Sequence, residues 1–189
     1  MKINRVKLII NIVTNILFVG YPFIIYLSLY YNWVNLAIFY LVVSFVLRLV
    51  TLPNLFANIR WMTKLIACIG LFLALMSWFC AKYQILLFYP VLVNFVFFIT
   101  FGYTLYQPQS MVEKFARLKH VNLSAEGVLY TRKVTLYWCL FFIVNGAIAL
   151  TTCLINNMYW WTLYNGLISY ILIGIFMGVE WLIRQKIQH

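Results

Sequence analysis

Three asparagines, Asn15, Asn94 and Asn145, stand near the middle of long apolar runs, where a polar side chain has few partners. An amide in such a run must bond to another polar group of the protein or to a polar ligand. The pattern therefore predicts one of two arrangements. Either the amides form hydrogen bonds that fix the packing of neighbouring helices, or they line a polar cavity for a lipid-like amphiphile.

Two ionisable side chains also interrupt the apolar runs. Glu180 is the carboxylate and Arg48 the guanidinium within them, and each lies close to the end of its run. Such groups mark substrate or proton pathways, but a charge near the end of a segment also reaches water at low cost. We expect Glu180 to be ionised and paired with Arg48, Arg132 or Lys133, which lie at the same depth.

Groups that could carry out catalysis form no recognisable pattern. The histidines are His120 and His189, the acids are Glu113, Glu126 and Glu180, and the chain contains no aspartate. An enzyme requires a nucleophile beside a base, paired carboxylates or a set of metal ligands. The sequence therefore predicts no catalytic, cofactor-binding or metal-binding residue.

The cysteines Cys68, Cys80, Cys139 and Cys153 lie in apolar runs without C-x-x-C spacing. This arrangement predicts neither a zinc site nor a redox motif. Cys80 and Cys153 are both expected near the outer surface, and the sequence does not fix the distance that decides whether they form a disulfide.

The elements that position these residues follow from the composition. Hydrophobic residues make up 66% of the chain and charged residues only 9%, whereas about a quarter of a soluble protein is charged. Most of the surface must therefore face lipid. The net charge of +11 does not indicate binding to nucleic acid, because the basic residues punctuate the apolar runs instead of gathering on one face.

Six apolar runs approach the length of about 20 residues that a bilayer span requires. They predict an all-α fold, a polytopic transmembrane helix bundle of six spans, forming a single membrane domain over residues 1–189. The expected spans are 8–30, 34–52, 63–82, 85–105, 135–155 and 160–182. Of the 14 lysines and arginines, all except Lys82 fall in alternate connections, at the ends of the spans that border them, or at the termini, which places both termini in the cytoplasm.

The cytoplasmic connection 106–134 is long and basic. Ser110 and Glu113 form an S-x-x-E capping box, which predicts the start of a short helix. Ser124 is expected to cap the next helix, which runs into the fifth span.

The short helix, over residues 111–119, is expected to lie on the membrane surface as an interfacial helix. Its apolar residues share one face, with Phe115 and Leu118 toward lipid or the bundle. Glu113 and Arg117 form an i,i+4 pair on the other face. The apolar face is made of Met111, Val112, Phe115 and Leu118.

A family resemblance rests on four stretches: PQSMVEKFARL (108–118), LYTRKVTLYWCLFFIVNG (129–146), WWTLYNGLISYILIG (160–174) and GVEWLIR (178–184). From Gln107 onward the chain resembles an uncharacterised bacterial polytopic inner-membrane family found beside acyl-carrier and ketosynthase genes of the aryl-polyene type. Before Gln107 only the hydropathy matches.

A more distant resemblance rests on Trp138, Phe141, Phe142 and Asn145, followed by Trp161. These residues are similar to a pattern of the intracellular septation protein A family, which is polytopic and linked to envelope integrity and division. Neither family supplies a catalytic residue that carries over to this chain.

The resemblances imply a non-enzymatic accessory of the bacterial inner membrane that acts in acyl or polyene envelope-lipid assembly or in envelope integrity. Its expected partners are membrane lipid and acidic acyl carrier or synthase proteins, drawn to the basic connection; the basic residues have a second explanation, that they only enforce the topology. No nucleic acid and no cofactor are expected. The alternative is a small transporter or flippase for an amphiphile, and a membrane-bound transferase comes third.

Overall fold

The computed structural model is helical in every regular element that it describes. The described residues are 13, 16–17, 20–28, 30–31, 33–50, 60–80, 82, 84–118 and 123–188. Only the backbone is described at residues 34, 48, 50, 60–63 and 186–188. The predicted all-α fold class is confirmed for these residues.

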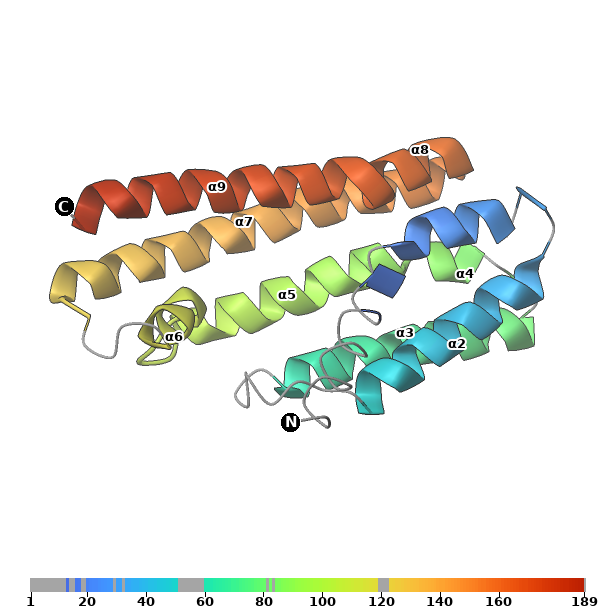
Figure 1. The fold of residues 1–189 in the computed structure, drawn as a ribbon, viewed down its shortest axis with the longest axis horizontal. Coiled ribbons are helices and arrows are strands. Elements are labelled where there is room, and N and C mark those ends of the chain that lie inside the picture. The colour runs from blue at the N-terminus through green and yellow to red at the C-terminus, as the bar shows by residue number, and fades with distance from the viewer. Residues whose placement is uncertain are drawn as a thin grey trace. The chain divides into compact units, whose positions relative to one another are not determined.

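The helices belong to two compact units, each assembled from two segments of the chain. Unit 1 comprises Met1–Pro90 and Ala149–Tyr170, and unit 2 comprises Val91–Ile148 and Ile171–His189. Figure 1 labels the elements. They are α2 (Val34–Val50), α3 (Arg60–Cys80), α4 (Gln84–Leu87), α5 (Tyr89–Leu105), α6 (Met111–Arg117), α7 (Ala125–Ile155), α8 (Met158–Leu163), the π-helical turn η2 (Tyr164–Ile168) and α9 (Ser169–Gln188).

Within the described part of the chain, three helical stretches are long and apolar enough to cross a membrane: Gln84–Leu105, Ala125–Ile155 and Met158–Gln185. They coincide with the predicted fourth, fifth and sixth spans. Two shorter apolar helices, Asn35–Leu47 and Lys64–Cys80, fall within the predicted second and third spans. The predicted first span lies partly outside the described residues, and its described part includes the helical segment 20–28.

Helices α2 and α3 pack side by side in unit 1 (Figure 1). The buried face of α3 carries small side chains at helical spacing, which let apolar helices approach closely. These residues are Ala67, Gly70, Ala74 and Ser77. The closest approach is at Gly70, where a Cβ atom would lie 2.0 Å from the ring of Phe45 on α2.

A turn at Phe88 separates α4 from α5, two residues before Pro90. Proline has no backbone N–H, and its ring clashes with the carbonyl four residues earlier, so a regular helix does not continue through it. In an apolar environment, the backbone groups at such a break must find partners on neighbouring elements. The partners at this break are side chains of α7 and α8, described below.

Aromatic side chains of α5, α7 and α9 form a cluster in unit 2. Its members are Phe97, Phe101, Trp138, Phe141, Phe142 and Phe176. The ring of Trp138 lies 4.5 Å from that of Phe176, and Phe142 stacks on Phe97 at 5.1 Å, measured between centroids. Three of the residues that resemble the septation family, Trp138, Phe141 and Phe142, are thus packing residues that join helices of unit 2.

The first three backbone N–H groups of α6 all donate to hydroxyl groups of unit 2. These bonds run from Met111 to Thr104 at 2.9 Å, from Val112 to Thr135 at 3.2 Å and from Glu113 to Ser110 at 3.4 Å. Helix N-termini leave such donors without intrahelical partners. The hydroxyls therefore fix the residue at which α6 begins and hold its first turn against α5 and α7. The predicted caps are confirmed, since Ser124 likewise accepts from the N–H of Gly127 at 3.2 Å.

The ion pair of α6 follows the prediction, whereas the burial of Glu113 was not predicted. The expected ion pair is present, with Arg117 Nη2 at 2.7 Å from Glu113 Oε1. However, Met111 and Glu113 are buried, while Phe115 and Leu118 are exposed. The hydrogen bonds to the hydroxyls hold the first turn of α6 in the interior of unit 2. The carboxylate of Glu113 is buried as a result, and Arg117 neutralises its charge.

Candidate functional site

Two of the three predicted asparagines meet in unit 2. Asn145 Nδ2 donates to Asn94 Oδ1 at 3.0 Å, and both side chains are buried. Gly146 adjoins them, and a Cβ atom there would lie 3.1 Å from Cβ of Asn94, so its lack of a side chain lets α5 and α7 come close. This geometry matches interhelical hydrogen bonding. Asn15 lies outside the described residues.

Glu180 has a different cation from the expected ones. Its Oε1 lies 3.8 Å from Nε of Arg184, one helical turn later on α9. The hydroxyl of Tyr130 donates to the same Oε1 at 3.5 Å and to the Glu180 carbonyl at 3.3 Å. The i,i+4 spacing on one helix supplies this cation without any long-range approach.

The predicted pairing of Glu180 with Arg132 is wrong in this structure. The guanidinium of Arg132 donates instead to the carbonyl of Leu105, at the C-terminus of α5. A cation there is favourable because the last helical carbonyls lack intrahelical partners and carry the negative end of the helix dipole. Lys133 is exposed, and the side chain of Arg48 lies outside the described residues.

A second group of polar contacts, in unit 1, surrounds the break between α4 and α5. The carbonyl of Leu87 accepts two hydrogen bonds at 3.0 Å, from Nε1 of Trp161 and from Sγ of Cys153. Trp161 is fully buried, and its ring is edge-on to that of Tyr21 at 6.0 Å. Tyr21 is also edge-on to Tyr89 at 5.2 Å. We call these five residues the Trp161 cluster.

The π-helical turn η2 follows directly after this cluster. Asn165 Nδ2 donates to the carbonyl of Trp161 at 2.9 Å and to Oγ1 of Thr152 at 3.2 Å. A Cβ atom at Gly166 would lie 3.2 Å from the ring of Phe23, so segment 20–28 sits against η2. π-helical turns occur often at functional sites, because one wider turn redirects side chains and leaves backbone groups for other partners.

The two Asn-Gly pairs of the chain act alike. In each pair, the asparagine forms a hydrogen bond to another segment and the glycine lets a neighbouring segment approach. Asn145-Gly146 does so in unit 2 and Asn165-Gly166 in unit 1. Asn165 and Tyr21 were not predicted as site residues, although the Asn-Gly repeat and the sequence Tyr21-Pro22 were available signals.

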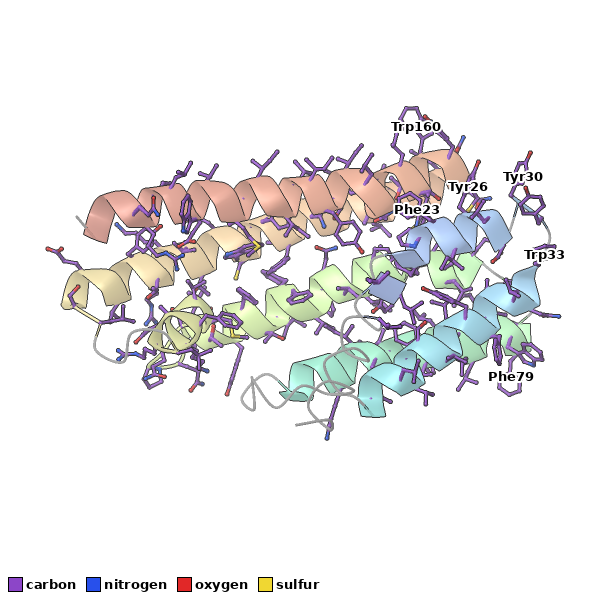
Figure 2. All side chains as sticks on the ribbon, viewed as in Figure 1. Phe23, Tyr26, Tyr30, Trp33, Phe79 and Trp160 are labelled. Atoms are coloured by element: carbon purple, nitrogen blue, oxygen red, sulfur yellow. The ribbon has the colours of Figure 1, made fainter. Side chains whose placement is uncertain are left out.

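Exposed aromatic side chains gather at one end of unit 1. Figure 2 shows Tyr30, Trp33 and Phe79 at this end, with Tyr26 and Trp160 nearby. Tyr30, Trp33, Phe79 and Trp160 are each more than half exposed, at 70%, 60%, 81% and 55%. Aromatic residues at the end of an apolar bundle are typical of the level where lipid headgroups meet the hydrocarbon.

Comparison with protein-family models, with curated proteins and with solved structures finds no match for the chain. Both family resemblances therefore stay predictions. The four cysteines are free thiols, Cys80 and Cys153 included. Among the described residues, no three His, Cys, Asp or Glu side chains gather in a way that could hold a metal ion.

Proposed function

We propose that the chain is a six-span protein of the bacterial inner membrane with both termini in the cytoplasm. Three long and two shorter apolar helices supply segments for five spans, and segment 20–28 belongs to the first. Of the 14 basic residues, only Lys82 then faces outward, as the positive-inside rule favours. The aromatic end of unit 1 takes the outer headgroup level.

This topology predicts the side of each connection. A phosphatase reporter that is active only outside should be active after fusion at Asn32, Gln84 or Asn157. A fluorescent reporter that is active only inside should give signal at Ser124 and not at those three positions. The charge asymmetry is the physical reason. A cytoplasmic signal at Asn157 would rule out six spans.

Within this topology we propose a non-enzymatic accessory in the assembly or placement of an acyl or polyene envelope lipid. The observation that carries the proposal is the basic surface of α6 and the first turns of α7, with Lys114, Arg132 and Lys133. Arg132 and Lys133 are exposed and Lys114 is partly exposed. The nearby Glu113 is buried and already paired with Arg117, so Lys114 and Lys133 are available to an acidic carrier or synthase.

Reversing two of these charges should weaken such docking. The double variant Lys114→Glu/Lys133→Glu is expected to lose on the order of tenfold in affinity for a purified acyl carrier protein, because steering depends on charge. Raised salt should weaken the wild-type complex as well. Lys82→Glu, which makes one such charge reversal on the proposed outer side, is the control and should bind like wild type, whereas each single reversal, Lys114→Glu or Lys133→Glu, should weaken binding.

The same variants test the biological role. In a deletion strain, wild type and Lys82→Glu should restore the envelope lipid or polyene pigment profile, while the double variant should not, at equal amounts of protein in the membrane. A deletion strain with an unchanged lipid and pigment profile would overturn the proposed function.

The second candidate is a small transporter or flippase for an amphiphile. Its support is the break between α4 and α5 together with the π-helical turn η2, both in unit 1. Transporter sites are commonly built from interrupted helices, whose freed backbone and polar side chains face a substrate. On this proposal the Trp161 cluster, rather than the Asn94–Asn145 pair, is the candidate site.

A further inference from the structure

Two buried hydroxyl groups of unit 1, one within the Trp161 cluster and one beside it, have no hydrogen-bond partner among the described residues. They belong to Tyr21, which is 6% exposed, and Thr162, which is 8% exposed. Buried polar atoms are nearly always bonded, and an exception calls for a specific cause such as an unseen partner. In an apolar surrounding, the loss of hydration without replacement is costly.

The two hydroxyls lie on segments that contact each other. Tyr21 packs edge-on against Trp161, the residue that precedes Thr162 on α8. The Tyr21 ring is also edge-on to that of Tyr89, with 5.2 Å between the ring centroids. The π-helical turn η2 begins two residues after Thr162, and Tyr21 is followed by Pro22, which has no backbone N–H.

We propose that the hydroxyls of Tyr21 and Thr162 bind the uncharged polar end of a lipid-like amphiphile, such as a hydroxyl or carbonyl group. This names the ligand class of the transporter-like site, and it rests on that second candidate function. A hydroxyl can both donate and accept, so it suits either group. The ligand's chain would lie toward the exposed side chain of Phe23, on the segment that sits against η2.

The described side chains that contact this region favour an uncharged polar group over a charged headgroup. Those named around the two hydroxyls are aromatic rings, a thiol, a hydroxyl and an amide, and none carries a formal charge. A phosphate or carboxylate buried there would lack a counter-charge, which is far more costly than a neutral group that is hydrogen-bonded. Aromatic rings are suitable walls for the apolar part of the ligand.

The test is the thermal unfolding of the purified, delipidated protein in detergent, with and without dioleoylglycerol, which has one hydroxyl and no charge. The amphiphile is expected to raise the unfolding temperature of wild type by about 2 to 4 °C. Tyr21→Phe and Thr162→Val should lose this shift, because each lacks one hydroxyl. Tyr31→Phe, which removes a hydroxyl from an exposed tyrosine, is the matched control and should keep the shift.

The anionic lipid dioleoylphosphatidic acid, with the same chains, is expected to give no shift that depends on Tyr21 or Thr162. Equal shifts in all variants would overturn the proposal, because the lipid would then act non-specifically. The absence of a shift in wild type would also overturn the proposal, whatever the unfolding temperatures of the variants without lipid.

A variant that fails to fold does not block the test. If Tyr21→Phe does not fold, Thr162→Val is compared with Thr162→Ser. Thr162→Ser keeps the hydroxyl and should keep the lipid-dependent shift of the unfolding temperature. The assay contains no carrier protein and no deletion strain. Its failure is therefore distinguishable from failure of the docking or lipid-profile experiments.

Discussion

Gly70→Ala is expected to destabilise the protein by about 3 kcal/mol, at the upper end of the range for overpacked sites. The added Cβ atom would lie 2.0 Å from the Phe45 ring, far inside van der Waals contact. That ring has little room to withdraw, because it is only 2% exposed and its centroid is 5.2 Å from that of Tyr89. Helices α2 and α3 would have to separate.

Unfolding in detergent, followed by the reaction of the buried thiol of Cys153 in unit 1 with a thiol reagent, measures this effect. Phe45→Leu should partly rescue Gly70→Ala, because the smaller side chain vacates the space that the methyl group needs. Gly174→Ala is the matched control, since a Cβ atom at Gly174 meets nothing within 4 Å. Equal losses for Gly70→Ala and Gly174→Ala would show that the close packing at Phe45 is not what matters.

Much of the helical framework is predictable from hydropathy and capping residues. Runs of apolar residues long enough to span a bilayer have only one way to satisfy their backbone locally, which is a helix. Ser110 and Ser124 mark helix starts because their hydroxyls replace missing intrahelical partners, and this depends on the local sequence alone. The close packing of α3 against α2 at Gly70 also follows a local rule, because small residues recur at helical spacing along α3.

The partners of the polar side chains are less predictable. Asn94 and Asn145 were recognised as groups that need a partner, but their mutual bond depends on how α5 and α7 are rotated. Glu180 has several cations at similar depth, and the nearest one, Arg184, lies on its own helix. Arg132 binds a backbone carbonyl instead. Every residue has a backbone carbonyl, so the sequence contains no signal that Arg132 would bind this one.

The Trp161 cluster was missed for the same reason. Its central acceptor is the carbonyl of Leu87, at the end of α4 and beside the break before Pro90. Pro90 is visible in the sequence, whereas the side chains that reach the break come from residues more than 60 positions later in the chain. Only the three-dimensional arrangement joins them.

Trp161 should therefore be the most sensitive single side chain of unit 1. Trp161→Ala is expected to cost about 3 to 5 kcal/mol in stability, since it removes a fully buried indole and leaves a cavity against Tyr21. Trp160→Ala is the matched control on the same helix. Trp160 is 55% exposed, so its loss should cost much less in detergent.

The hydrogen bond to Leu87 can be separated from the packing of the indole. Trp161→Phe keeps an aromatic ring but removes the N–H donor, and we expect a loss of about 1 to 3 kcal/mol because a buried carbonyl loses its strongest partner. The Cys153 thiol, a weak donor, still reaches that carbonyl at 3.0 Å in the wild-type structure. Cys153→Ser supplies a stronger donor at the same place and should recover part of the loss in the Trp161→Phe background. If Cys153→Ser gives the same change in stability in both backgrounds, the two side chains do not share the Leu87 carbonyl, and the break before Pro90 is held by packing alone.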